Sequence, residues 1–337
     1  MKEECILHIG MHKTGSSSIQ ATLYENFIHN EYEYLRLRKD YSVFMYTIFQ
    51  KDVIHPYLIK KGIGETVDRL RIKYRKELEQ KILGSDKSRI IISGEGIVSI
   101  DQHYLIYLRN FLSKYFKKTT VIAYVRPPVS YIQSHFQQKI KNGFDSFNLS
   151  LSYPNYRDKF GKFDKLFGKE NVLLFKFDPN SLKDGDVVHD FLSRLDVDIS
   201  SEKIIRVNDS LSLEAIALIY IYRKFGPNYG AGVEALRKNK YLISILREIG
   251  NTKFKLSQEV IKPILDANRK DIVWMQKRLG EDLIEVAQNM GISSESELLN
   301  QDFKQLLACL TREEFVVDGE LSFSKIAKVI DDKITKI

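Results

Sequence analysis

Cysteine is scarce in this sequence. Cys5 and Cys309 are the only two among 337 residues, and they lie far apart. A chain of this length with two distant cysteines rarely depends on a disulfide framework, and neither cysteine has neighbours at zinc-ligand spacing. We therefore expect two buried or half-buried thiols, with neither a disulfide nor a metal site.

Long apolar runs are also missing. No stretch approaches the roughly 18 apolar residues that a membrane span needs. The short apolar run near the N-terminus follows acidic Glu3 and Glu4 and precedes Lys13, a pattern unlike that of a secretory signal peptide. These absences predict a cytoplasmic location.

The remaining composition is that of a globular protein with a basic surface. Hydrophobic residues make up 43% of the chain, enough to bury a sizeable core without disulfides or metals. The formal net charge of +8 favours anionic partners such as nucleotides, acidic polysaccharides, nucleic acids or membrane surfaces. The basic residues are dispersed, and the long Lys/Arg block of a nucleic-acid-binding tail is missing.

Strand and helix patterns alternate over the first 212 residues. We predict strands at 5–9, 89–93, 120–125 and 172–176, and helices at 16–28, 65–83, 104–115, 128–140, 156–167 and 187–195. This alternation predicts an α/β fold with a parallel β-sheet flanked by helices and a ligand site at the carboxyl ends of the strands. The rest is mostly helical, so we divide the chain into an α/β core, 1–212, and a C-terminal helical annex, 213–337.

A glycine-rich loop joins the first predicted strand to the first predicted helix. Gly10 and Gly15 have the Gly-x-x-x-x-Gly spacing of a phosphate-binding loop, and the helix N-terminus behind them attracts anions. An ATP- or GTP-binding loop would continue with Gly-Lys-Ser/Thr, but Ser16 stands where that lysine should be, and the lysine lies inside the loop at Lys13. A lysine at this earlier position can meet a 5′-phosphate, while the backbone N–H groups of residues 14–18 hold the remaining oxygens.

The string from His8 to Gln20 closely resembles the 5′-phosphosulfate loop of bacterial PAPS-dependent sulfotransferases, where PAPS is 3′-phosphoadenosine-5′-phosphosulfate. That family usually has Thr-Thr or Thr-Ser after the second glycine, and Ser16 and Ser17 keep the hydroxyls. The resemblance covers about residues 4–210 and implies a P-loop-containing nucleotide-binding fold, PAPS as the donor, PAP as the product and no metal requirement. It implies that the donor is bound by Gly10, Met11, His12, Lys13, Thr14, Gly15, Ser16, Ser17 and Ser18.

PAPS carries a 3′-phosphate, so a second anion site is required. Arg126 directly follows the third predicted strand, and Ser134 lies eight residues later on the next helix. The same family pairs an arginine at a strand end with a serine eight positions on, and the planar fork of arginine can donate twice to one phosphate. The resemblance therefore implies Arg126 and Ser134 as the 3′-phosphate site, with Ser130 as an alternative hydroxyl.

Residues 208–212 carry a third resemblance. Their sequence, Asn208-Asp209-Ser210-Leu211-Ser212, is similar to a segment that is common in these bacterial proteins and could border the nucleotide. A helix N-cap at Ser210 or Ser212 explains the same residues equally well.

Sulfuryl transfer needs a base within hydrogen-bond reach of the acceptor hydroxyl. Glu95 follows the strand at 89–93, and in related cytosolic sulfotransferases a histidine base sits at the end of the corresponding strand. We take Glu95 as the first candidate, with Gly94 and Gly96 expected to let a substrate approach closely. His12 is the second candidate, because histidine titrates near neutral pH. Lys13 is placed to stabilise the charge on the leaving phosphate.

Two other classes of function stay open. A P-loop nucleotide kinase or NTPase would share the glycine loop but should carry a lysine at position 16, and magnesium-dependent ATP turnover would identify it. A non-catalytic anion-binding protein would fit the basic pI. The aromatic and basic interleaving of RNA-binding proteins is missing, so we expect no nucleic-acid partner.

The acceptor is implied by the family alone. It is expected to be a hydroxyl of a carbohydrate, in a polysaccharide, lipopolysaccharide or glycolipid, which leaves room for peripheral membrane association. Residues 30–80 and the C-terminal helices are expected to shape its pocket. Aromatic side chains that could stack on sugars are Trp274, Tyr32, Tyr34 and Tyr46. The sequence leaves the oligomeric state open.

Overall fold

The structure is a computed structural model that describes residues 1–37, 41–63, 66–207, 210–228, 230–285, 290–301 and 322–335. Cys5 is a fully buried free thiol, as predicted. Cys309 and the pair Asn208-Asp209 lie outside the described residues.

Within the described residues, the strands form one parallel sheet in the order β2-β3-β1-β4-β5. The strands are β1 (Lys2–His8), β2 (Tyr32–Tyr34), β3 (Arg89–Ser93), β4 (Phe116–Val125) and β5 (Val172–Lys176). Successive side chains of a strand point to opposite faces, and yet Ile90, Ile91 and Ile92 are all 0% exposed. Both faces of the sheet are therefore covered, as in other parallel sheets, and the predicted α/β fold is confirmed.

Helices connect and cover the strands. In the core they are α1 (Ser16–Asn26), α2 (Tyr41–Phe49), α3 (Pro56–Lys60), α4 (Val67–Gly84), α5 (Gln102–Leu112), α6 (Pro128–Lys141), α7 (Tyr156–Phe167) and α8 (Val187–Ser193), with a short 3₁₀ helix, η2 (Glu95–Ser99), after β3. Further along the chain are α9 (Leu213–Phe225), α10 (Val233–Leu246), α11 (Gln258–Ala267), α12 (Arg269–Leu279), α13 (Glu295–Leu299) and α15 (Phe323–Thr335). None of the helices that the structure describes is long and apolar enough to cross a membrane.

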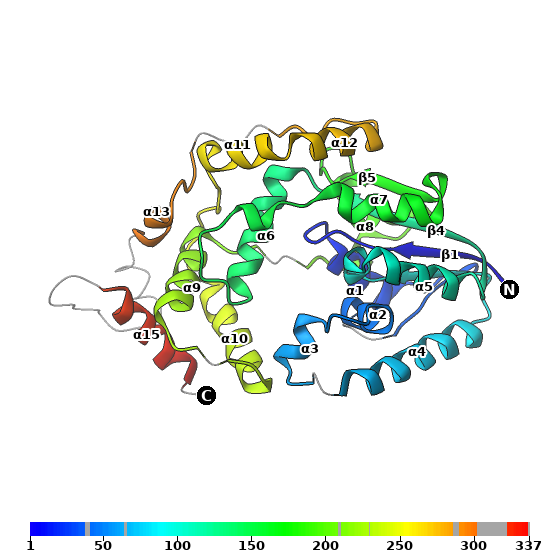
Figure 1. Ribbon diagram of the computed structural model, residues 1–337, viewed down its shortest axis with the longest axis horizontal. Coiled ribbons are helices and arrows are strands. Elements are labelled where there is room, and N and C mark those ends of the chain that lie inside the picture. The colour runs from blue at the N-terminus through cyan, green and yellow to red at the C-terminus, as the bar shows by residue number, and fades with distance from the viewer. Residues whose placement is uncertain are drawn as a thin grey trace.

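The C-terminal helices pack onto the sheet region. Figure 1 shows α9, α10 and α15 grouped on the side of the molecule away from the N-terminus, with α11 and α12 along the top. Contacts join α9 to α6, and α12 to α7 and β5. One hydrophobic cluster includes Ile91 of β3, Ile219 of α9 and Ile330 of α15. The core is thus continuous across residue 212, and the division at that position stays a prediction.

The position of β1 decides where a site can form. It lies between β3 and β4, with His8 in register with Ser93 on one side and Ile122 on the other. Because the three strands are parallel, the segments that follow them emerge at the same edge of the sheet. This edge brings together the glycine loop, Glu95 and Arg126, which are far apart in the sequence.

Candidate active site

The loop after β1 contains three residues in the left-handed region. Gly10, Lys13 and Gly15 have φ angles of 64°, 68° and 75°. For a lysine this conformation costs about 1–2 kcal/mol, and such strain is typical of functional sites. Left-handed residues in a loop that leads into a helix are typical of backbone nests that bind anions.

The two loop glycines are also needed for close approach. A Cβ atom at Gly10 would lie 3.0 Å from the Cα of Glu95, and one at Gly15 would lie 2.5 Å from Cγ1 of Val187 on α8. Larger residues would push the loop away from η2 and α8. The glycine spacing therefore serves both the turn and the contact between the loop and the Glu95 segment.

Helix α1 begins at Ser16, as predicted, but its N-cap is Gly15, and Ser16 to Ser18 form its first turn. The hydroxyl of Ser18 accepts a hydrogen bond from the backbone N–H of Val207, at 3.0 Å. Ser17 is exposed. The hydroxyl of Ser16 is buried and has no hydrogen-bond partner among the described residues. Because buried hydroxyls normally have partners, this one fits a ligand oxygen.

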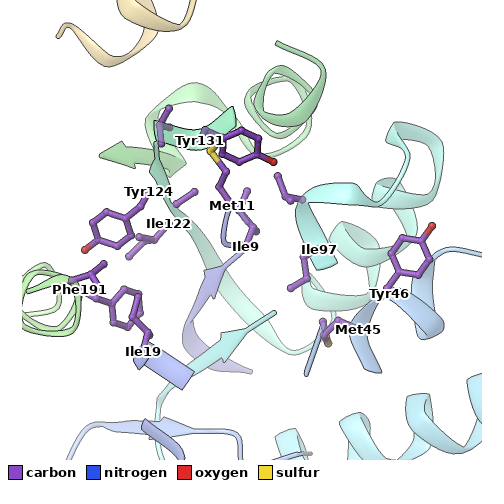
Figure 2. Packing of buried hydrophobic residues seen from close by; sticks show 14 of the residues in the cluster. Ile9, Met11, Ile19, Met45, Tyr46, Ile97, Ile122, Tyr124, Tyr131 and Phe191 are labelled. Carbon is purple, nitrogen blue, oxygen red and sulfur yellow. The ribbon is translucent and has the colours of Figure 1, made fainter. Parts of the chain in front are cut away.

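Thr14 and Met11 shape the loop from within. The Thr14 hydroxyl donates to the carbonyl oxygen of Met11 at 2.7 Å, so it closes the turn. The Met11 side chain is fully buried, and Figure 2 shows it directed toward Tyr131 of α6. Its sulfur accepts a 3.4 Å hydrogen bond from the backbone N–H of Arg126. These two residues hold the loop against the end of β4.

His12 and Glu95, the two candidate bases, form a single hydrogen-bonded pair. Nδ1 of His12 lies 2.7 Å from Oε1 of Glu95. The His12 side chain is 40% exposed and that of Glu95 is 23% exposed, so the imidazole is the more accessible member. The pair joins the loop after β1 to the 3₁₀ helix after β3.

The carboxyl group of Glu95 is held in its ionised form. Burial by itself raises its pKa, but the charge of His12, the hydrogen bond from His12 and the charge of Lys13 outweigh burial and lower the pKa below its ordinary value. An ionised Glu95 accepts the proton on Nδ1 of His12, which leaves Nε2 with its lone pair free to act as a base.

Two further histidines lie next to this pair. The ring of His135 stacks between those of His12 and Tyr131, with centroid distances of 6.4 Å and 5.3 Å. Burial, together with the charges of His12 and nearby lysines, lowers the pKa of His135 to about 3. His8 is fully buried, and its Nδ1 lies 2.8 Å from the hydroxyl of Ser93. His135 carries no signal in the sequence, because only the packing of α6 on the loop brings it to His12.

Arg126 lies against the glycine loop. Its Nη1 donates to the carbonyl oxygen of Lys13 at 2.6 Å, and its Nε donates to the hydroxyl of Ser130 at 3.1 Å. Ser130 is the alternative hydroxyl of the sequence analysis. Ser134 is half-buried one turn further along α6, on the same helix face, because residues four apart are neighbours. The role of Ser134 in phosphate binding stays a prediction.

A carboxylate from a distant segment lies where the resemblance predicts the 3′-phosphate site. Oε2 of Glu285, in the segment after α12, accepts a hydrogen bond from the backbone N–H of Ser130 at 2.8 Å. This N–H belongs to the first turn of α6, where the helix dipole favours negative charge. Burial lowers the pKa of Arg126, and the charge of Glu285 opposes that shift. Sequence reasoning missed Glu285, since no motif surrounds it.

The glycines beside Glu95 have a different use from the one expected. A Cβ at Gly96 would lie 2.6 Å from the carbonyl oxygen of Ser42 on α2, and one at Gly94 would lie 3.1 Å from Cδ1 of Ile97. Both glycines are therefore packed against other parts of the protein. The expectation of an open approach for substrate was wrong, and the glycines instead let η2 pack against α2.

The segment before α9 supports the helix-cap interpretation. The hydroxyl of Ser212 accepts from the backbone N–H of Ala215 at 3.0 Å, so Ser212 is the N-cap of α9. Among the aromatic candidates for sugar stacking, Tyr32, Tyr34 and Tyr46 are buried in the core, with at most 8% exposed. Trp274 is half-buried and lines a cavity.

Comparisons with known proteins give distant similarities. No family model matches the chain. A curated protein from Archaeoglobus fulgidus, described as uncharacterized, is 20% identical over 136 residues, which is 40% of this chain and only 37% of that protein.

The similar solved structures include two sulfotransferases. One is a sulfotransferase from Alicyclobacillus acidocaldarius, with 11% identity, a TM-score of 0.44 and coverage of 82% of this chain and 96% of that one. The other is the sulfotransferase domain of the Synechococcus PCC 7002 olefin synthase, with 14% identity, a TM-score of 0.34 and coverage of 60% and 77%. At these values the function has to be argued from the chain's own residues.

Proposed function

We propose that this protein is a sulfotransferase that moves the sulfuryl group of PAPS to a hydroxyl of a carbohydrate and releases PAP. The observation that carries the proposal is the meeting of the glycine loop, Arg126 and the hydrogen-bonded His12–Glu95 pair at the same sheet edge. Arg126 bonds to the Lys13 carbonyl, and the loop that holds Lys13 also holds His12, which bonds to Glu95.

The residues fit a donor that carries phosphate on both sides of its ribose. On the 5′ side the strained loop, the N-terminus of α1 and the unpartnered Ser16 hydroxyl suit a phosphosulfate. On the 3′ side the Arg126 guanidinium and the first turn of α6 suit a phosphate, and the hydrogen bond from the Ser130 N–H to the Glu285 carboxylate supports an anion there. A nucleotide with phosphate only at its 5′ position would leave the second site unused.

The chemistry then follows from the positions of the side chains. The acceptor oxygen attacks sulfur, a new O–S bond forms, and the bond between sulfur and the bridging phosphate oxygen breaks. The electron pair of that bond leaves with PAP, and Lys13 stabilises the resulting charge. The proton of the acceptor hydroxyl passes to Nε2 of His12.

The geometry changes the order of the two candidate bases. A carboxylate with a lowered pKa is a weak base, and Glu95 is also the less exposed of the two side chains. We therefore assign His12 as the base and Glu95 as the positioning residue that fixes the imidazole tautomer and stabilises the imidazolium once it forms.

The experiment supplies PAPS labelled in its sulfuryl group and a panel of polysaccharides, lipopolysaccharides and lipid-linked sugars, with EDTA present. We expect the label to move to one class of glycan, and Lys13→Ala to lower the rate by about 100- to 1,000-fold, the loss typical of one donor to a developing charge. Lys76→Ala, at an exposed position on α4, is the matched control and should keep full activity. Near-normal transfer by Lys13→Ala would contradict the loop assignment, and magnesium-dependent ATP turnover without sulfate transfer would contradict the proposed function.

A further inference from the structure

A cavity of about 680 Å³ lies against the end of η2, the short 3₁₀ helix that begins at Glu95. Its wall includes Val98 and Ser99, which belong to the same short 3₁₀ helix as Glu95. At about 2 Å of rise per residue, this helix separates Ser99 from Glu95 by about 8 Å along its axis. The other walls come from α7 and α12, which also lie side by side in Figure 1.

One wall of the cavity is the indole of Trp274 on α12, the single tryptophan of the chain. A Cβ at Gly161 of α7 would lie 3.6 Å from Cζ2 of this indole, so the side-chain-free face of α7 lies against the ring. The cavity therefore has an aromatic wall that packs against α7 at Gly161, where the helix carries no side chain.

Two contacts fix α12 on α7 on either side of the tryptophan. One turn before Trp274, the carboxylate of Asp271 accepts from the backbone N–H groups of Tyr156 and Arg157, both at 2.8 Å, and so caps α7. One turn after it, Arg278 donates to both carboxylate oxygens of Asp164, at 2.7 and 2.8 Å. The indole is thus held in place before any ligand arrives, which lowers the entropic cost of binding.

The same cavity has an excess of positive charge. Its basic side chains are Arg157, Lys159, Lys162 and Lys165, and its acidic ones are Asp101, Asp158 and Asp164. Arg278 already neutralises Asp164, so four cations face two other carboxylates.

Two of these lysines are poorly solvated. Burial and the charge of Lys162 lower the pKa of Lys159 to about 8, and burial lowers the pKa of Lys162 to about 8 as well. Lys159 donates to the hydroxyl of Tyr131 at 3.2 Å, and Lys162 donates to the carbonyl oxygen of Ile100 at 2.6 Å. An anion in the cavity would add to the counter-charge that Asp271 gives Lys159 and that Asp101 and Asp158 give Lys162.

We propose that this cavity binds an acidic sugar, with the apolar face of the pyranose on the indole of Trp274 and its carboxylate or sulfate ester on Lys159 and Lys162. An aromatic wall with a few convergent polar groups is the usual form of a small-molecule site. Resting on the proposed function, the sugar is a unit of the acceptor glycan, held so that a neighbouring hydroxyl reaches His12. A row of contacting side chains connects the cavity to the base. It consists of Lys159, Tyr131 and His135 in that order, and the ring of His135 stacks on that of His12.

The test uses the fluorescence of the single tryptophan and needs neither PAPS nor turnover. The intact protein is titrated with a trimer of galacturonic acid, a sulfated trisaccharide, the neutral trisaccharide maltotriose and inorganic tripolyphosphate. We expect saturable changes in emission with both acidic trisaccharides, and none with maltotriose at the same concentrations. Equal binding of maltotriose, or tripolyphosphate binding as tightly as the acidic sugars, would overturn the proposal.

A lysine variant provides the second arm. Lys159→Gln combined with Lys162→Gln should weaken the binding of the acidic trisaccharides by about 10-fold or more, as expected for lost hydrogen bonds from charged groups. The matched control is Lys76→Gln, on the exposed face of α4. Calorimetric binding of PAP to the double variant verifies that it is folded, and unchanged sugar affinity in that folded variant would overturn the assignment. If the protein binds PAP but no sugar, the proposal for the cavity is wrong and the proposed donor is still supported. If it binds the acidic sugars but no PAP, the proposed sulfotransferase function is wrong and the proposed sugar site is still supported.

Discussion

At His12 the chemistry depends on which ring nitrogen carries the proton. Glu95 settles this, because an ionised carboxylate 2.7 Å from Nδ1 can only accept, and the proton must then sit on Nδ1. From the sequence alone, Glu95 and His12 are alternative candidates for the general base. The structure instead makes them partners, which no spacing in the sequence could show, since the two residues follow different strands.

The first prediction separates the two roles by chemical rescue. His12→Gly should lower kcat by about 100- to 10,000-fold, the usual contribution of a general base. Added imidazole should restore part of this activity, because it can occupy the space left by the side chain. Glu95→Gln should lower kcat by a smaller factor and should not respond to imidazole.

PAP affinity completes this test, and it should stay the same in Glu95→Gln as in the wild type. If formate rescues Glu95→Gly and His12→Gly keeps near-normal kcat, Glu95 is the base and our assignment is wrong.

At the scale of elements, the segment after α12 and the first turn of α6 form a contact that the proposed donor would displace. Glu285 bonds to the N–H of Ser130 beside Arg126, where the 3′-phosphate is proposed to bind. A ligand that competes with an internal group loses affinity in proportion to the fraction of molecules in which the site is blocked.

We therefore predict that Glu285→Ala strengthens PAP binding by about 3- to 10-fold, the gain expected when a blocked fraction becomes competent. The affinity for 5′-AMP should not change, because this nucleotide carries no 3′-phosphate. Glu281→Ala, in the exposed part of the same segment, is the matched control. Calorimetry measures both nucleotides, and weaker PAP binding by Glu285→Ala would mean that the carboxylate helps to hold the site rather than to block it.

The elements that the sequence predicts well are those whose pattern is local. Strands β3 and β5 match the predicted ranges in full, since buried parallel strands are short apolar runs, and α7 matches because its apolar positions recur with helical spacing. The glycine loop and Arg126 were found because each carries its signal in neighbouring residues.

The features that were missed depend on distant pairs. The short edge strand β2 and the apolar helix α2 lie in an aromatic-rich stretch without clear periodicity. Glu285 becomes meaningful only where it meets Ser130, and Trp274 becomes a cavity wall only because Asp271 and Arg278 fix α12 on α7. The sequence contains these residues, but their contacts arise only in the folded chain.

At the scale of the whole molecule, buried histidines couple stability to pH. Burial lowers the pKa of His8 to about 4, despite the opposing charge of Glu95. The folded state therefore binds the proton less readily than the unfolded chain. The contribution of the neutral His8 to the free energy of unfolding is complete above pH 6.5 and is lost as the pH falls from 6.5 toward 4. The loss amounts to up to about 3 kcal/mol at 1.36 kcal/mol per pKa unit.

We predict that the free energy of unfolding in urea falls between pH 6.5 and 4.5, and that His8→Gln makes this fall less steep. His103→Gln changes an exposed histidine of α5 and should leave the slope as it is. NMR titration of the folded protein gives an independent readout, in which the His8 ring should stay neutral at pH 5. Protonation of that ring near pH 6.5 in the folded state would contradict the prediction.

The central claim is that two proposed anion sites, one in the loop after β1 and one at Arg126 after β4, select a 3′,5′-bisphosphorylated donor. The most direct measurement is calorimetric titration of PAP and of 5′-AMP into the wild-type protein and into Arg126→Ala. The account predicts that wild type prefers PAP by about 100-fold and that Arg126→Ala loses most of this preference while binding 5′-AMP as before, since a charge-assisted hydrogen bond contributes about 1.5–3 kcal/mol. Equal affinities of the wild type for PAP and 5′-AMP, or an unchanged preference in Arg126→Ala, would contradict it.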